Sequence, residues 1–93
     1  MTGMARRIRV HGRVQGVFYR GWAIEAACDL GLRGWVRNRR DGSVEMLVDG
    51  NEETVGLMIE RARRGPSAAR VDRLDVEETD EDVPPGFTQR PTV

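Results

Sequence analysis

The chain has 93 residues, which is enough for one domain and too few for two. We therefore expect a single domain over residues 1–93, with a core at about 6–78 and a C-terminal tail at 79–93. The only cysteine, Cys28, excludes an internal disulfide framework and an all-cysteine metal site. No apolar run is long enough to cross a bilayer, and the first residues lack the apolar core of a signal peptide. A cytoplasmic protein is the resulting expectation.

Charge is unevenly distributed along a chain whose net charge is zero. Residues 1–40 contain nine arginines and two acidic residues, whereas residues 41–93 contain six arginines and thirteen acidic residues. An anionic ligand would be attracted to the first part and repelled by the second. Arginine supplies every basic side chain, for which a compositional bias is the simpler explanation, although arginine also suits forked contacts with phosphate.

The first part of the chain predicts a strand, a loop and a helix. Residues 7–11 alternate polar and apolar side chains, which is typical of a strand with one face buried. Glycines at both ends of residues 12–16 indicate a turn. Apolar residues then recur at helical spacing over residues 19–30, and Gly31 would end this helix in a left-handed conformation.

Two strand-like runs, residues 34–38 and 44–48, follow and are joined by an Asp-Gly pair that indicates a hairpin. A two-residue loop is one alternative. We favour a three-residue loop with a left-handed Gly42, because it places Val36 opposite Met46 and gathers apolar side chains on one face. Asn38 would then lie opposite Val44, next to the turn.

The last part predicts a helix and a strand. Asn51 would cap a helix with acidic residues in its first turn, arginines in its last, and an apolar stripe between them, ended by Gly65-Pro66. A strand is expected at residues 70–77, with a bulge or a late start at Val71, which is out of phase with Leu74 and Val76. Phe87 would anchor the tail. The order strand, helix, strand, strand, helix, strand predicts an α+β, ferredoxin-like sandwich: a four-stranded antiparallel sheet with two helices on one face.

Most of the residue types used in catalysis lack, in this sequence, the partner residues that a metal site or an activated nucleophile would need. His11 lacks partners for a metal site, which favours a solvent-facing strand residue. Cys28 falls in the first helix with no histidine near it in sequence, which favours a buried, inert thiol. The acidic residues are scattered along helix ends and the last strand, where solvated surface is the ordinary explanation.

The segment from Gln15 to Arg20 is the strongest candidate site. It joins a strand to a helix N-terminus, where backbone N–H groups lack internal partners and attract anions. Gly16 permits a turn in which successive N–H groups converge, and Arg20 would add a forked, charge-assisted contact. By spacing alone, a structural turn followed by a solvated arginine is an equally good interpretation.

Two motifs resemble the signatures of the acylphosphatase family. Residues 10–20 read VHGRVQGVFYR, similar to V-x-G-x-V-Q-G-V-x-F/Y-R, and residues 34–45 read GWVRNRRDGSVE, similar to G-W-V-x-N-x-x-D-G-x-V-E. Residues 65–72 also fit a later segment of the family, so the resemblance covers about residues 7–76. Family members commonly end shortly after a phenylalanine with an arginine and an aromatic residue, whereas Phe87 is followed here by TQRPTV.

The resemblance implies a hydrolase that cleaves the carboxyl-phosphate bond of acyl phosphates to carboxylate and inorganic phosphate. In-line attack by water would need no metal, cofactor or covalent intermediate. Carried over by position, Arg20 would bind the phosphate, Asn38 would hold the attacking water, and the backbone of Gln15, Gly16, Val17, Phe18 and Tyr19 would form a cradle. By position alone, Asn38 could instead bond to nearby backbone. We expect a monomer that acts on a small-molecule acyl phosphate and has no nucleic-acid or membrane partner.

Three alternatives remain open. The same pocket would serve a non-catalytic phosphate or anion module. A nucleic-acid module can share this architecture, but residues 7–11 and 44–48 lack the aromatic side chains on which such modules stack bases. The chain could also serve as a carboxyl-phosphatase domain of a larger maturation enzyme, although a free-standing protein is the simpler expectation.

Overall fold

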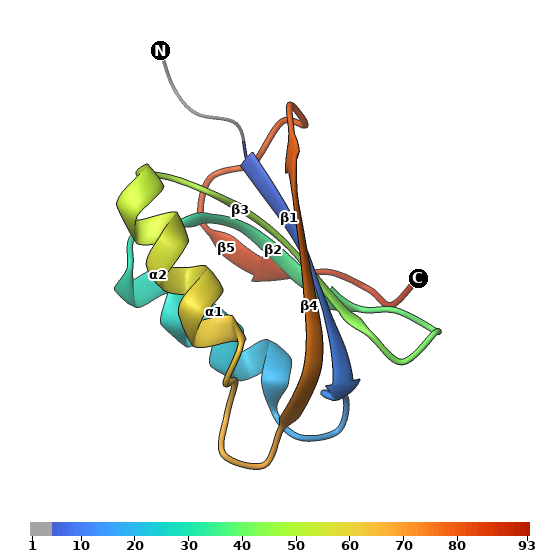
Figure 1. Cartoon of the computed structure of the whole chain (residues 1–93). Helices are drawn as coiled ribbons and strands as arrows, with labels where there is room; N and C mark the ends of the chain where they lie inside the picture. Colours follow the sequence, from blue (N-terminus) through green and yellow to red (C-terminus); the bar gives the residue numbers. More distant parts are fainter. Residues whose placement is uncertain (1–4) are drawn as a thin grey trace.

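The computed structural model describes residues 5–93 and arranges them as five strands and two helices (Figure 1). In chain order these are β1 (Ala5–Arg13), α1 (Tyr19–Asp29), β2 (Arg33–Asn38), β3 (Val44–Asp49), α2 (Glu52–Ala62), β4 (Arg70–Thr79) and β5 (Phe87–Gln89). The strands form one sheet in the order β4-β1-β3-β2-β5, and both helices cover the same face. Neither helix in this part of the chain has the length and apolar character that a membrane span requires. The predicted placement of two helices on one face is confirmed.

The prediction of a four-stranded antiparallel sheet is wrong, because a fifth strand makes the sheet mixed. The first four strands pair antiparallel, but β5 pairs in parallel with β2, with Phe87 opposite Gly34. A strand of three residues has too little alternation for its period to be recognised. It forms because Phe87 is buried in the main core and the chain after the left-handed Gly86 follows the free edge of β2.

The β2–β3 hairpin has the predicted three-residue loop. Val36 lies opposite Met46, Asn38 lies opposite Val44, and Gly42 is left-handed with φ 96°. Because side chains alternate along a strand, Asn38 shares the face of the buried Val36, which is the face that the helices cover.

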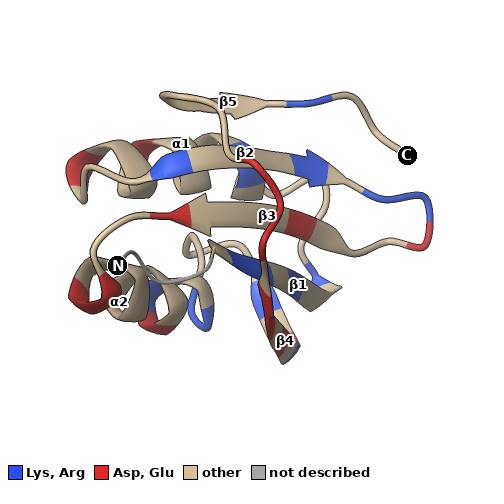
Figure 2. Ribbon diagram, turned by 90° about the horizontal axis from the view of Figure 1, so that it is seen from above, with Lys and Arg blue, Asp and Glu red and all other residues tan. Residues whose placement is uncertain are grey.

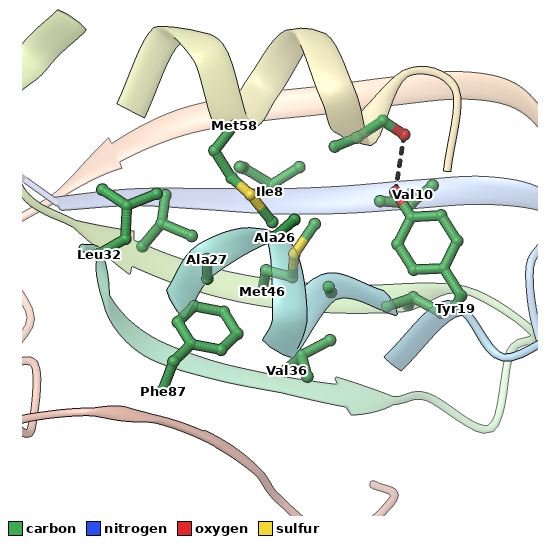
Figure 3. Packing of buried hydrophobic residues seen from close by; sticks show 14 of the residues in the cluster. Ile8, Val10, Tyr19, Ala26, Ala27, Leu32, Val36, Met46, Met58 and Phe87 are labelled. Atoms are coloured by element: carbon green, nitrogen blue, oxygen red, sulfur yellow. Dashed lines mark hydrogen bonds between the residues drawn. The ribbon is translucent and has the colours of Figure 1, made fainter. Parts of the chain in front are cut away.

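The core fills the space between this face and the two helices (Figure 3). Strands β1, β2 and β3 contribute branched and long apolar side chains, while α1 contributes three alanines, which let the helix approach the sheet closely. Tyr19, 1% exposed, lies at the start of α1, and its hydroxyl donates a hydrogen bond to the carbonyl of Ala62 in the last turn of α2 at 2.6 Å. Burial raises the pKa of Tyr19. The first turn of α1 is thereby fixed against α2.

Of the bulge and the late start expected at Val71, the structure shows the bulge, since β4 already begins at Arg70. The register of β1 with β4 shifts so that His11 pairs with Arg73 but Gly12 pairs with Val71. Gly12 has φ 129°, and a Cβ there would lie 2.2 Å from the carbonyl oxygen of Arg70. A side chain at this position would clash with backbone, so the irregularity near the end of β1 requires glycine.

The division of charge along the sequence is not a division in space. Arginine-rich β1 lies between β3 and the acidic β4 (Figure 2). On the face of the sheet away from the helices, Glu45 is 2% exposed and accepts hydrogen bonds from Arg7, Arg37 and Arg39 at 2.8–2.9 Å. These arginines form ion pairs with the Glu45 carboxylate, so their charge contributes little to the attraction of an external anion.

We predict that Glu45→Gln lowers the free energy of unfolding by roughly 1–3 kcal/mol at pH 7, because it removes the charge that three arginines share. Burial alone would raise the pKa of Glu45, but the hydrogen bonds from the arginines outweigh burial and hold the pKa below its usual value of 4.5. A depressed pKa contributes stability above the unfolded-state value and loses it as the pH falls through the folded-state value.

Urea unfolding measured from pH 7 downward tests this prediction. The wild type should lose stability below about pH 4.5, and the variant should lose less. Glu25→Gln is the matched control, because Glu25 is exposed on α1 and has no ion pair within residues 5–93. If Glu45→Gln and wild type showed the same pH dependence, the arginine cluster would not hold Glu45 ionised.

Candidate active site

Two left-handed residues shape the loop between β1 and α1. Gly16 has φ 75° and Phe18 has φ 69°, with Val17 between them. Glycine adopts such angles without cost, whereas an aromatic residue seldom does. Left-handed residues in a turn direct successive N–H groups toward one side, which is the arrangement of a backbone anion-binding concavity.

The backbone donors of this loop are free to bind a ligand. In the described part of the chain, the N–H groups of residues 16–21 have no hydrogen-bond acceptor, and the first bond of α1 runs from Trp22 N–H to the Phe18 carbonyl at 3.0 Å. Phe18 occupies the N-cap position, where its side chain makes no capping bond. Unpaired donors at the positive end of a helix dipole favour an anion.

A cavity of about 200 Å³ opens beside this loop. It is lined by Val14, Gly16, Phe18, Tyr19, Arg20, Gly21, Asn38 and Gln89. The structure thus brings the loop, the first turn of α1, the end of β2 and the C-terminal segment to one place. Arg20 and Asn38, far apart in sequence, border the same cavity.

Arg20 is the charged side chain among these lining residues. Its guanidinium forms no ion pair and no hydrogen bond within residues 5–93, and the first turn of α1 contains no acidic residue. The arginines around Glu45 differ, because a carboxylate already occupies them. Arg20 can therefore give its full charge and its planar set of donors to an anion in the cavity.

Asn38 contributes a carboxamide at the last position of β2. Its Oδ1 atom is shielded from bulk solvent and accepts no hydrogen bond from residues 5–93. Its backbone is held on both sides, because Asn38 pairs with Val44 and its carbonyl accepts a hydrogen bond from Val93 N–H at 3.3 Å. A buried acceptor without a protein donor on a fixed strand is suited to binding a water molecule or a ligand.

The remaining predicted residues have different positions. Gln15 does not line the cavity: its Nε2 donates to the carbonyls of Arg39 at 2.7 Å and Ser43 at 2.9 Å. Val17 packs on the core, and Tyr19 lines the cavity while its hydroxyl reaches α2. Gln15 therefore ties the loop to the hairpin that carries Asn38.

Gln15→Ala should loosen this tie and lower the free energy of unfolding by about 1–2 kcal/mol. It should also lower, roughly tenfold, the kcat of the acyl phosphate hydrolysis that the sequence resemblance implies. The inhibition constant of inorganic phosphate should change by less, because the N–H groups of the loop remain. Steady-state kinetics and urea unfolding of the same preparations measure these quantities. An unchanged kcat in a destabilised variant would reduce Gln15 to a purely structural role.

Sequence reasoning missed three lining residues, Val14, Gly21 and Gln89. Val14 and Gly21 are the immediate neighbours of the predicted segment, residues 15–20, and extending that segment by one residue at each end would have included them. Gln89 has no comparable signal, because its position depends on the parallel pairing of β5 with β2.

The other reactive side chains lie outside the cavity. His11 is partly exposed on β1, 3.1 Å from a carboxylate oxygen of Asp75. The prediction that Cys28 is buried is wrong: it is exposed, because Ala26 and Ala27 take the inward positions of α1. Within residues 5–93, no group of three or more His, Cys, Asp or Glu side chains is arranged to hold a metal ion.

Comparison with known proteins gives a consistent result. The model of the acylphosphatase family matches residues 6–89. An acylphosphatase of Rhizorhabdus wittichii is 58% identical over 90 residues, covering 97% of this chain and 91% of the relative. The crystal structure of the Bacillus subtilis acylphosphatase has a TM-score of 0.89 at 34% identity and covers 94% of this chain and 98% of its own. The structure of an acylphosphatase from Coxiella burnetii has a TM-score of 0.90 at 31% identity and covers 96% of this chain and 94% of its own. The chain belongs to the acylphosphatase family.

Proposed function

We propose that this protein hydrolyses acyl phosphates in the cavity between Arg20 and Asn38, by attack of water on phosphorus without a metal or a covalent intermediate. The activity, cleavage of the carboxyl-phosphate bond, is that of the family. The observation that supports the site is the meeting of unpaired N–H groups, an unpaired guanidinium and an unpaired carboxamide oxygen around one cavity.

Binding is the first task of the site. The phosphoryl group of an acyl phosphate is dianionic near neutral pH, and the N–H groups of residues 16–21 would surround its equatorial oxygens. Arg20 would add forked, charge-assisted hydrogen bonds. Because these donors are held by the loop and by the first turn of α1, little reorganisation accompanies the build-up of charge in the transition state.

The reaction itself requires little from the protein. The oxygen of a water molecule forms a bond to phosphorus, and the bond from phosphorus to the acyl oxygen breaks, leaving its electron pair on the carboxylate. The phosphoryl oxygens take up one proton of the water and the other is released to solvent. Carboxylate is a good leaving group, so neither a strong base nor a protein nucleophile is needed.

Asn38 would place the water in line with the leaving group. A carboxamide can accept from a water molecule through oxygen and donate through nitrogen, and it carries no charge that would repel the phosphate. Positioning of this kind converts a bimolecular step into one that is effectively unimolecular.

A non-catalytic anion module would have the same pocket, so the decisive test is turnover. Release of inorganic phosphate from acetyl phosphate is measured with a chelator present and compared with the spontaneous rate. We expect multiple turnovers that the chelator does not reduce. Phosphate binding without turnover would support the module instead, and loss of activity to the chelator would contradict the metal-free mechanism.

Cytoplasmic location, a monomeric state and the absence of nucleic-acid partners are further parts of the proposal. Trp35, an aromatic residue on the open face of the sheet, is only 1% exposed and lies beneath Arg37 and Arg90, so it offers no surface on which a base could stack. Light scattering of the purified protein tests the monomeric state.

A further inference from the structure

Phe18 has an unusual environment for an aromatic side chain. It is 64% exposed, more than Leu57, Val76 or Val93, the other large apolar residues of residues 5–93 with substantial exposure. It belongs to neither buried apolar cluster. Phe18 is nevertheless one of the residues that line the cavity, together with Arg20 and Asn38.

The backbone conformation of Phe18 is also unfavourable for an aromatic residue. With φ 69° and ψ 24°, it is the non-glycine residue with positive φ in the described part of the chain. Glycine would meet this requirement without strain, and it would also avoid exposing a ring. Neither the turn nor the core therefore explains a phenylalanine here. Backbone strain in a residue that borders a site is a reason to look for a functional contact.

The ring of Phe18 has a defined position. A Cβ added to Gly21 would lie 2.3 Å from the Cε1 atom of Phe18, so the ring rests on the first turn of α1 in space that Gly21 leaves free. The absence of a side chain at Gly21, which also lines the cavity, thus leaves room for the ring to lie against this turn. An aromatic ring that already lies against a helix loses less conformational freedom when a ligand packs on it than a ring free in solvent would.

The geometry points to Phe18 as the acyl-group subsite: its ring packs against the organic part of the substrate and favours aromatic acyl phosphates over small ones. This inference rests on the proposed function, because the phosphoryl group would be held by N–H groups of the same loop. Whatever is bonded to that group then lies near the ring of Phe18. Aromatic groups pack on each other in offset or edge-to-face contacts that a methyl group cannot make.

The experiment compares kcat/KM for benzoyl phosphate with kcat/KM for acetyl phosphate in each protein. Phe18→Gly removes the ring and suits the backbone, so the cradle should persist. We expect the ratio of benzoyl to acetyl to fall about threefold to tenfold relative to wild type. The inhibition constant of inorganic phosphate should change less than about twofold, because phosphate lacks an acyl group.

Two further variants sharpen the test. Phe18→Leu keeps an apolar side chain without the aromatic face, and its ratio should lie between those of wild type and Phe18→Gly. Leu57→Ala removes an exposed apolar side chain from α2, away from the cavity, and its ratio should equal that of wild type.

The outcomes separate this inference from the proposed function. If wild type hydrolyses both substrates and the ratio is the same in Phe18→Gly and wild type, Phe18 is not the acyl subsite, whereas the proposed function stands. If wild type hydrolyses neither substrate, the proposed function fails and the acyl subsite fails with it.

Discussion

Arg20→Gln is expected to lower kcat/KM for an acyl phosphate by roughly 10²–10⁴. The change removes two charge-assisted hydrogen bonds of about 1.5–3 kcal/mol each, and 1.4 kcal/mol corresponds to a factor of ten. Because Arg20 has no ion pair or hydrogen bond within residues 5–93, the substitution leaves no carboxylate unpaired. The loss should therefore appear in kinetics and in phosphate affinity while the free energy of unfolding stays nearly constant.

Arg13→Gln provides the matched control. Arg13 is exposed at the end of β1, close in sequence to the loop, and does not line the cavity. Its loss makes the same change in net charge and should alter kcat/KM by less than about threefold, through long-range attraction alone. Similar losses in the two variants would mean that net positive charge, and not a direct contact from Arg20, binds the substrate.

Much of the fold was predictable because the deciding constraints are local. The three-residue hairpin loop follows from an Asp-Gly pair and from the need to gather Val36 and Met46 on one face. Asn51 caps α2 as predicted, its side chain accepting a hydrogen bond from Glu53 N–H at 2.8 Å. In each case a few neighbouring residues determine the conformation.

What the sequence could not predict depends on contacts between distant segments. β5 exists because Phe87 is buried and the following residues meet the edge of β2, which no period in three residues can indicate. Cys28 lies next to the inward Ala27, so an error of one helical position decides whether the thiol is buried or exposed. The bond from Gln15 to the hairpin likewise needs the folded sheet.

In the candidate site, too, the features set by neighbouring residues were predictable, and those set by distant contacts were not. Motif residues placed Arg20 and the loop correctly at the start of a helix, because a strand, a glycine turn and a helix are local features. That Asn38 borders the same cavity depends on the hairpin register, which could be predicted only as the favoured one of two alternatives. The exposed ring of Phe18 is a property of the folded chain alone.

Asn38→Ala should lower kcat roughly 10²-fold while inorganic phosphate still binds, because the variant keeps Arg20 and the N–H groups that hold the anion. The backbone contacts of Asn38 with Val44 and Val93 do not involve its side chain, so the hairpin should persist. Single-turnover kinetics measure the chemical step, and competitive inhibition by phosphate measures the binding that remains.

Asn38→Asp distinguishes the effect of Asn38 on the orientation of the water molecule from the effect of its lack of charge on phosphate binding. An aspartate has nearly the same size and can accept a hydrogen bond from water, but its charge opposes the phosphate, so it should weaken phosphate binding where alanine does not. Raising the ionic strength should reduce that difference, because salt screens the repulsion. If alanine weakened phosphate binding as much as it slowed turnover, Asn38 would be a binding residue, and the water would have to be positioned by another group.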